Sequence, residues 1–173
     1  MKNDRVGLGV KPGNKQKIVA ITLVAMVALF GIVLLARKAT DHRVELRQAL
    51  DSRDSYRLEQ LLKDHPKLVS AEIPNRGPKD TWNPLHMAAY WGNQEAIEIL
   101  LRHKAKVNAK DSNGLTPLHY SVSSGRHQCV TFLINKGADL NAKGRDGRTP
   151  LDLAKNLRDK KMIELFRIRG ATE

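Results

Sequence analysis

The sequence predicts an all-α fold, a solenoid of stacked helix–turn–helix units with β-turn fingers, preceded by a single transmembrane helix. A short phrase built around a proline recurs every 33 residues, at Pro84, Pro117 and Pro150. A period of this length is typical of small units, each of which buries its apolar face only against its neighbours. A separate uncharged run at residues 18–36 has the length of a membrane span. In such a solenoid, function is expected on a surface.

Residues 18–36 are uncharged, and Thr22 carries the only hydroxyl group among them. As a helix rising about 1.5 Å per residue, this run would be about 28 Å long, close to the roughly 30 Å hydrocarbon core of a bilayer. A cleaved signal peptide is the competing interpretation, but Arg37 stands where cleavage would require a small residue. We therefore predict an uncleaved anchor at 18–36, followed by a linker at 37–42 and a repeat domain at 43–173.

Basic residues flank the apolar run on both sides, so their number alone does not decide its orientation. The basic residues that precede the run are Lys2, Arg5, Lys11, Lys15 and Lys17, and those that follow it closely are Arg37, Lys38, Arg43, Arg47 and Arg53. Short basic segments count most in setting orientation, whereas long domains cross the membrane largely regardless of charge. We expect the tail at 1–17 in the cytoplasm and the repeats in the periplasm or another extracytoplasmic compartment. The alternative is a repeat domain on the cytoplasmic side.

The first unit, at residues 43–75, is predicted to be the N-terminal cap. Apolar residues around Leu46 indicate one helix and those around Leu58 a second, which ends before Pro66 because proline cannot continue it. The extra residues Asn75–Pro78 predict a longer finger between the first unit and the second.

The recurring phrase is suited to starting a helix. Thr116 fits as the N-cap, Pro117 fits the first helical position where no amide donor is missed, and Leu118 begins a buried stripe. A second apolar helix follows, and Gly137 suits a left-handed helix stop. Asn113-Gly114 is a strong turn pair, which predicts the tip of a finger.

Other positions hold the same spacing, including Asn108 with Asn141 and Gly114 with Gly147. With these residues the sequence resembles the ankyrin repeat family, whose pattern reads roughly D-x-x-G-x-T-P-L-H-x-A-A-x-x-G, followed by an apolar helix and G-A-x-V-N-A. The resemblance covers residues 43–171, with the best copy at 111–143. It implies four repeats, at 43–75, 78–110, 111–143 and 144–171.

The fourth repeat departs from the pattern in a way typical of an outer cap. Asp152 replaces the histidine, Arg158 replaces the glycine after the first helix, and Arg167 replaces an apolar residue at the end of the second helix. These polar substitutions fit a final face that meets water rather than another repeat.

The sequence offers little support for catalysis, so no enzyme activity, catalytic residue, cofactor or metal site is predicted. His86 and His119 lie in the helix-start phrase, where the resemblance implies a ring that hydrogen-bonds across neighbouring units. No H-E-x-x-H, G-x-S-x-G or Walker-type motif occurs. The single cysteine, Cys129, falls at an apolar position of a second helix and is expected to be a buried, inert thiol.

The formal net charge of +12 is distributed unevenly along the chain. Residues 1–38 carry half of it, and nine Lys or Arg residues lie between 143 and 169. This basic end is interpreted as the solvated surface of a cap, with an anionic partner or lipid headgroups as the alternative. No nucleic-acid partner is expected, because the sequence shows no recognised nucleic-acid-binding module.

The resemblance implies that a protein partner meets the fingers and the exposed face of the first helices, and the chain is expected to be monomeric. Both tryptophans lie in the second repeat, and tryptophan, tyrosine and arginine often dominate interface energies. We expect an aromatic patch beside Arg145 and Arg148. A purely structural role for Tyr90 and Trp91, covering the seam between repeats, is an equally weighted alternative. The candidate binding residues are Lys79, Asp80, Trp82, Tyr90, Trp91, Ser112, Asn113, Leu115, Ser123, Arg145, Arg148 and Asn156.

Three functions are compatible with this surface. The leading hypothesis is a membrane-anchored interaction module without chemistry of its own. The second is an immunity or inhibitor protein whose surface masks the active site of a partner enzyme. The third, an enzyme, would require a buried polar pocket that the repeat pattern does not predict.

Overall fold

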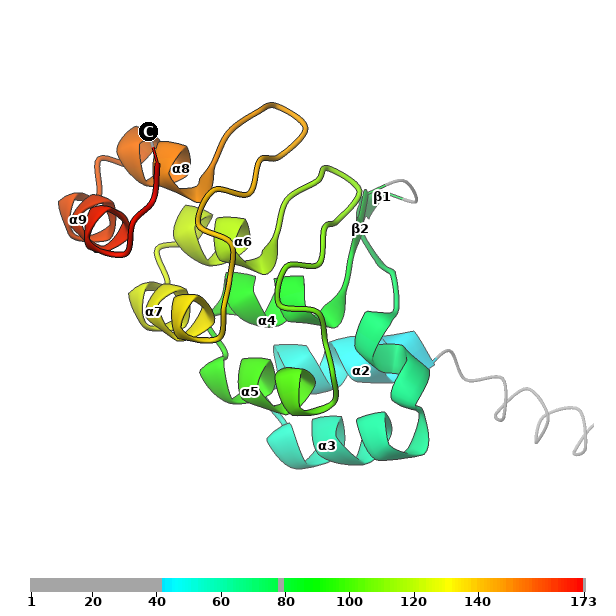
Figure 1. Ribbon diagram of the computed structural model, residues 1–173. Coiled ribbons are helices and arrows are strands. Elements are labelled where there is room, and N and C mark those ends of the chain that lie inside the picture. The colour runs from blue at the N-terminus through cyan, green and yellow to red at the C-terminus, as the bar shows by residue number, and fades with distance from the viewer. Residues whose placement is uncertain (1–41, 78–79, 173) are drawn as a thin grey trace, which may run out of the picture. The chain divides into compact units, whose positions relative to one another are not determined.

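The computed structural model describes residues 42–77 and 80–172 of the chain (Figure 1). The predicted anchor at 18–36, the tail at 1–17 and most of the linker lie outside these residues. Within them, no helix is both long enough and apolar enough to cross a membrane. The described chain forms four helix pairs, whose members are α2 (His42–Asp51) and α3 (Ser55–Asp64), α4 (Pro84–Trp91) and α5 (Gln94–Arg102), α6 (Pro117–Ser123) and α7 (His127–Asn135), and α8 (Pro150–Asn156) and α9 (Lys160–Ile168).

The pairs stack in sequence order into a solenoid (Figure 1). The first helices α2, α4, α6 and α8 form one layer and the second helices α3, α5, α7 and α9 form the other. The segments that precede α4, α6 and α8 project from one side of the stack as fingers. This arrangement confirms the predicted ankyrin-type solenoid in the described part of the chain.

Local sequence explains where the first helices begin. Asn83 and Thr149 each cap a helix through their side chains, which accept hydrogen bonds from the main-chain N–H groups of His86 and Asp152. Proline occupies the first helical position of α4, α6 and α8, where its missing donor costs nothing. The predicted roles of Thr116 and Pro117 are confirmed by the capping box at the start of α6.

The apolar faces of the helices meet in one continuous core. Leu118 and Leu133 are fully buried between the two layers, as are Leu85 and Leu151 in the neighbouring pairs. Cys129 is also buried in this core, which confirms the sequence prediction for its place. Burial raises the pKa of its thiol, although Arg126 and Arg53 oppose that rise.

One finger adds a short β-hairpin to the predicted helical solenoid. The longer finger between the first two pairs forms an antiparallel hairpin of β1 (Ile73–Gly77) and β2 (Asp80–Trp82), preceded by the 3-10 helix η1 (Pro66–Ser70). Ile73 pairs with Trp82, and both side chains are buried. The extra residues of this finger give it enough length to pair with itself.

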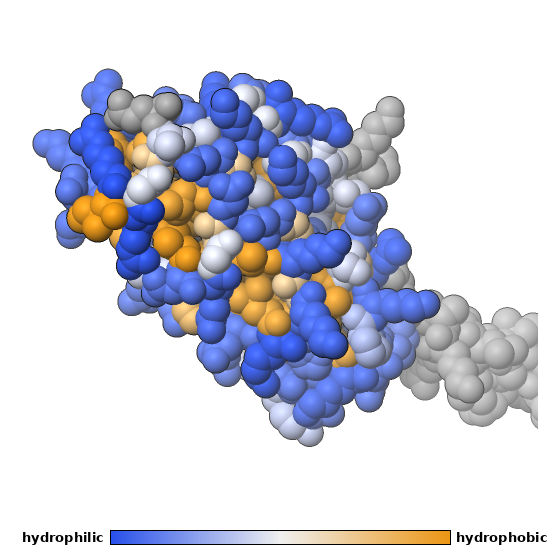
Figure 2. Space-filling model, viewed as in Figure 1, coloured by the Kyte–Doolittle hydropathy of each residue, from blue (hydrophilic) through white to orange (hydrophobic). Residues whose placement is uncertain are grey.

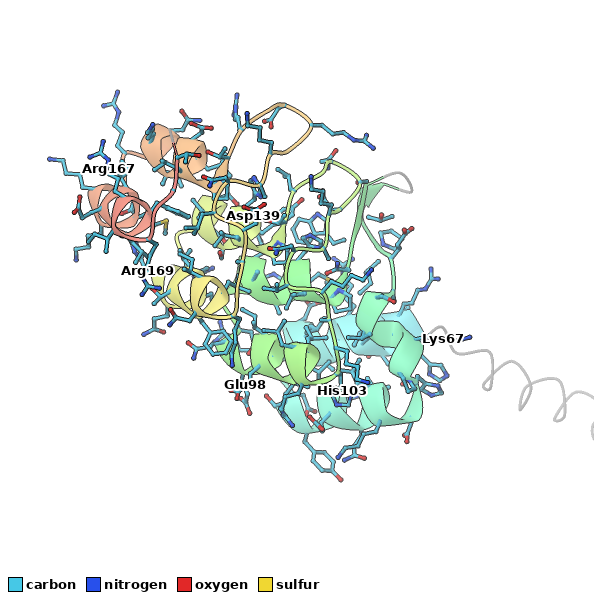
Figure 3. All side chains as sticks on the ribbon, in the orientation of Figure 1. Lys67, Glu98, His103, Asp139, Arg167 and Arg169 are labelled. Atoms are coloured by element: carbon cyan, nitrogen blue, oxygen red, sulfur yellow. The ribbon has the colours of Figure 1, made fainter. Side chains whose placement is uncertain are left out.

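Polar contacts join consecutive pairs along the second helices. His103, which follows α5, lies over α3 (Figure 3), and its Nε2 is 3.2 Å from Oε1 of Glu59. This hydrogen bond, together with the nearby positive charge of Arg102, holds the pKa of Glu59 below its usual value. Further along, Arg169 donates a 2.7 Å hydrogen bond to Asn135. These contacts lie at the surface and help to hold neighbouring pairs in register.

Candidate protein-binding surface

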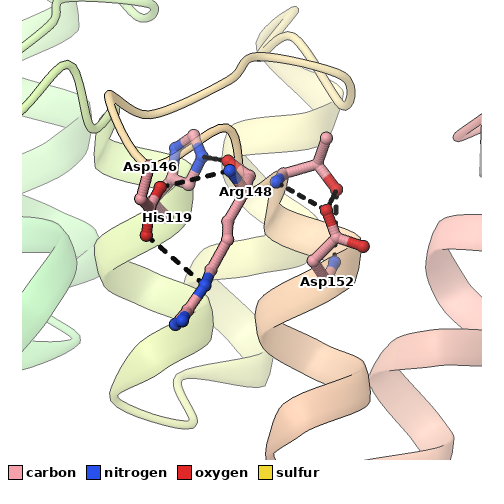
Figure 4. Close-up of polar contacts among 5 residues, drawn as sticks. His119, Asp146, Arg148 and Asp152 are labelled. Carbon is pink, nitrogen blue, oxygen red and sulfur yellow. Dashed lines mark hydrogen bonds and ion pairs between the residues drawn. The ribbon is translucent and has the colours of Figure 1, made fainter.

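Two buried histidines each connect a first helix to the finger of the next unit. Nδ1 of His86 accepts a hydrogen bond from the Asn83 N–H, so Nε2 carries the proton, and Nε2 lies 3.0 Å from the carbonyl oxygens of both Ala109 and Leu115. His119 repeats this pattern one unit later, with Nε2 3.2 Å from the Arg148 carbonyl (Figure 4). Both rings therefore hydrogen-bond across units, as the sequence predicted.

These histidines are neutral parts of the framework. Burial lowers the pKa of His86 to about 4, although Asp111 and the two carbonyl groups oppose that shift. Burial also lowers the pKa of His119. Asp152 takes the corresponding place in the last pair, where its carboxylate accepts hydrogen bonds from the N–H and hydroxyl groups of Thr149 (Figure 4). The hydrogen bond from the Thr149 N–H is the main reason why the pKa of Asp152 is lowered.

Three aromatic rings gather where the first two fingers meet the helices. The ring of Trp82 lies 5.3 Å from that of Tyr90 and 4.5 Å from that of Tyr120, measured between centroids. The Tyr120 hydroxyl donates a 2.6 Å hydrogen bond to Asp111, whose other oxygen accepts the main-chain N–H groups of Asn113 and Leu115. We call Trp82, Tyr90 and Tyr120 the aromatic cluster. It joins the hairpin, α4, α6 and the next finger.

The aromatic cluster is mostly buried but reaches the surface at one ring. Trp82 and Tyr120 are 8% and 9% exposed, whereas Tyr90 is 40% exposed. The indole Nε1 of Trp82 is buried and has no hydrogen-bond partner within the described residues. Trp82 also lines a polar pocket of about 410 Å³ between the hairpin and the next finger, together with Thr81, Asn83, Lys110, Asp111 and Ser112.

The fingers are tied to one another by hydrogen bonds. The Thr81 N–H donates to the Ser112 hydroxyl, and the Arg145 N–H donates to the Asn113 carbonyl. Arg148 forms an ion pair with Asp146 of its own finger, at 3.5 Å. These bonds keep the projecting segments together as one edge of the molecule.

An exposed row runs along the first helices below the fingers. Tyr90, Ser123 and Asn156 occupy equivalent positions of α4, α6 and α8, and all three are exposed. The Ser123 hydroxyl donates to the carbonyl of Tyr120 in its own helix. The chemistry of the row therefore changes from aromatic to small and polar along the solenoid.

The structure brings together only part of the expected aromatic patch. Tyr90 joins Trp82, but Trp91 lines a different pocket, at the turns that follow the first helices. Tyr90 and Trp91 are successive residues of one helix and point in different directions, about 100° apart. The Arg145 N–H and the Arg148 guanidinium make their described contacts with finger residues. Lys79 lies outside the described residues, and only the backbone of Asp80, in β2, is described.

Sequence reasoning missed Tyr120 and Asp111. Tyr120 follows the helix-start phrase at the position that Met87 occupies in the preceding unit. A tyrosine at a core position needs a partner for its hydroxyl, and that requirement was the available signal. The carboxylate of Asp111 supplies the partner.

Stacked helix pairs with projecting fingers define a repeat-solenoid class of protein. A sequence model described as ankyrin repeats (3 copies) matches residues 46–144 and 111–171. These matches span well over half of the chain, so the chain belongs to the ankyrin repeat family. Ankyrin repeats generally mediate protein–protein interactions, and the family is generally non-enzymatic.

Curated relatives match a single stretch of the chain. Rabankyrin-5 of Mus musculus and Rabankyrin-5 of Homo sapiens are each 47% identical to it over 38 residues. That stretch is 22% of this chain and 3% of Rabankyrin-5. The similarity therefore extends over about one repeat and leaves the rest of those much longer proteins unmatched.

Proposed function

We propose that this protein is a membrane-anchored interaction module that binds a protein partner through its fingers and the exposed row of its first helices. The observation that carries the proposal is the aromatic cluster. It sets the half-exposed ring of Tyr90 on two rigidly packed neighbours, Trp82 and Tyr120. Rigid aromatic side chains lose little conformational entropy on binding, which makes them effective anchors for a partner.

The surface around the aromatic cluster offers polar groups as well. The adjoining polar pocket is lined by residues of β2 and of the next finger, including Lys110 and Ser112. In the view of Figure 2, most of the surface is hydrophilic, and the apolar residues appear as separate patches. An aromatic centre with a polar rim is the usual composition of a protein-binding site.

Anchoring rests on the sequence of residues 18–36, which supports an uncleaved span. The short basic tail at 1–17 favours an orientation with the repeats in the periplasm or an equivalent extracytoplasmic compartment. Tethering would raise the local concentration of the module near membrane-bound partners. A recruitment scaffold on the cytoplasmic side is the alternative orientation. The second candidate function, an immunity or inhibitor protein, uses the same surface and differs only in masking the active site of its partner.

Site-specific photo-crosslinking in intact cells tests the binding surface and identifies the partner in the same experiment. A photoreactive phenylalanine analogue is placed at position 90, and the matched control carries it at Tyr56, a 77% exposed tyrosine of α3. We expect a discrete adduct from position 90 and little from position 56. An adduct that forms only from position 56, or equally from both, would reject the proposed surface.

Identification of the adduct separates the two functions. If the crosslinked partner is an enzyme and the purified complex lacks its activity, the inhibitor function applies. If the partner retains its activity or has none, the interaction module stands.

A further inference from the structure

A second pocket lies at the turns that join the two helices of each pair, away from the fingers. Its volume is about 280 Å³, and its lining comes from three successive turns: Arg53 between α2 and α3, Trp91 at the end of α4, and Arg126 between α6 and α7. Fingers precede the first helices and these turns follow them, so the pocket is separate from the proposed partner surface. We call it the turn pocket.

Two guanidinium groups are held at the turn pocket by main-chain carbonyls. Nη2 of Arg53 donates to the Trp91 carbonyl, and Nε of Arg126 donates to the Tyr90 carbonyl, each at 3.2 Å. Arg126 also packs closely on Gly92, because a Cβ atom added there would lie 2.7 Å from Arg126 Cδ. These contacts place two cations beside one another, on the carbonyls of consecutive residues.

Neither cation is neutralised by these contacts. In the described part of the chain, neither Arg53 nor Arg126 forms an ion pair with a carboxylate, and both side chains are exposed. The acids of the adjoining turns have other partners: Asp54 and Asp159 cap α3 and α9 through their carboxylates, and Asp159 also pairs with His127 at 2.9 Å. The guanidinium groups therefore retain their charge and most of their N–H donors.

The backbone at Arg53 is strained. Its φ is 56°, in the left-handed region, where the corresponding turns of the next two pairs have Gly92 and Gly125. A side chain in that conformation costs about 1 to 2 kcal/mol relative to the ordinary right-handed one. Arg158 shares this conformation in the last pair but does not line the turn pocket, so it provides a matched control for Arg53.

We propose that the turn pocket binds a phosphorylated side chain of a protein segment, between Arg53 and Arg126 and against the half-buried ring of Trp91. A phosphate monoester carries nearly two negative charges and three acceptor oxygens, which match two forked guanidinium groups. The pocket is smaller than most sites for whole small ligands, and its size suits one such side chain. This inference does not depend on the proposed function of the finger surface.

Fluorescence anisotropy with the full chain in uncharged detergent tests the proposal. The probes are three short peptides of glycine and alanine carrying an uncharged fluorophore and a central phosphoserine, serine or glutamate. We expect the phosphoserine peptide to bind at least tenfold more tightly than the serine peptide, with the glutamate peptide between them. Equal binding of the phosphoserine and serine peptides would overturn the proposal.

A matched pair of variants separates the pocket from general positive charge. Arg53→Gly and Arg158→Gly each remove one arginine from a left-handed turn, but only Arg53 lines the pocket. We expect Arg53→Gly and Arg126→Gln to weaken phosphopeptide binding at least tenfold, and Arg158→Gly to leave it within about twofold. An equal loss in Arg158→Gly would show binding by overall charge and contradict the proposal.

Folding and the binding of lipid headgroups are checked with the same proteins. Thermal unfolding is expected to show that Arg53→Gly is folded, because relief of backbone strain offsets its lost hydrogen bond. Glycerophosphoserine, the soluble headgroup of an anionic lipid, is then compared with the phosphopeptide in the same detergent. If Arg53 is required for headgroup binding while the phosphopeptide shows no binding, the pocket recognises a lipid headgroup, and the proposed protein occupant is wrong.

Discussion

Single residues in this protein often carry a conformation or a charge state that the fold imposes. The turn after the first helix is left-handed in every described pair, with glycine at positions 92 and 125 and arginine at positions 53 and 158. Arg158 was recognised in the sequence as a departure from the glycine of the repeat. The structure shows that the turn keeps its conformation in spite of the side chain.

Arg158→Gly is expected to stabilise the protein by about 0.5 to 1 kcal/mol. The left-handed backbone at Arg158, with φ of 55°, disfavours any side chain, and glycine removes that cost at the expense of a more flexible unfolded chain. Chemical denaturation measures the change, with Arg158→Ala as the control that removes the charge and keeps the Cβ atom. A gain of similar size in Arg158→Ala would attribute the effect to charge instead.

The buried histidines predict how stability depends on pH. His86 has a pKa of about 4 in the folded protein and about 6.5 when unfolded, so the unfolded state binds more protons between these values. Stability is therefore greatest above about pH 6.5 and falls by about 3 kcal/mol as the pH decreases to about 4, with His119 acting in the same direction. Urea unfolding between pH 7 and pH 4.5 measures this slope. His86→Gln should flatten it, and an unchanged slope would contradict the assignment.

Secondary-structure elements follow the sequence closely where the repeat is regular. Thr116 and Pro117 start α6 as predicted, because capping chemistry is local and readable from a few residues. The hairpin of β1 and β2 was expected only as a long finger, since its pairing depends on the register between Ile73 and Trp82. That register comes from burial of both side chains, which is a tertiary effect.

The candidate site could be predicted only in outline. Exposed positions such as Tyr90 and Ser123 follow from the repeat register. The partnership of Tyr120 with Asp111 links two elements: the position of Tyr120 signals that its hydroxyl needs a partner, but only the fold shows that Asp111 supplies it. The separation of Trp91 from the aromatic cluster arises because Tyr90 and Trp91 leave the helix in different directions, and the resemblance alone did not resolve it.

Leu118→Ala tests the helix packing most simply. Leu118 is fully buried, so its truncation should cost about 2 to 5 kcal/mol in the free energy of unfolding. Leu157, 51% exposed after α8, is the matched control and should change stability by no more than about 0.5 kcal/mol when replaced by alanine. A loss below about 0.5 kcal/mol at Leu118 would count against the repeat register.

The whole molecule combines a repeat framework with polar surfaces at its last pair. Asp152, Lys155 and Arg167 stand on that pair at positions where the preceding units have His119, Val122 and Ile134, which are buried or half-buried. Their polar character suits an outer face that meets water. Ankyrin frames stay alike while their surfaces differ, so the identity of the partner depends on the surface residues.

The proposed membrane anchoring and orientation are tested on the full chain. We expect a C-terminal tag to resist protease in intact cells and to be cleaved once the outer barrier is opened, because the short basic tail is costly to move across the membrane. Deletion of residues 18–36 should release the protein from membranes at alkaline pH. A tag protected until the inner membrane is broken would place the repeats on the cytoplasmic side.

The central claim is that the fingers and the exposed row of the first helices bind the partner. The most direct measurement is the affinity of the partner identified by crosslinking for Tyr90→Ala, compared with Tyr56→Ala. Both variants remove an exposed tyrosine, but only Tyr90 belongs to the aromatic cluster. We predict at least a tenfold loss of affinity, about 1.4 kcal/mol, for Tyr90→Ala and no change for Tyr56→Ala. Unchanged affinity in Tyr90→Ala with a loss in Tyr56→Ala would place the binding surface on the second helices and contradict the account.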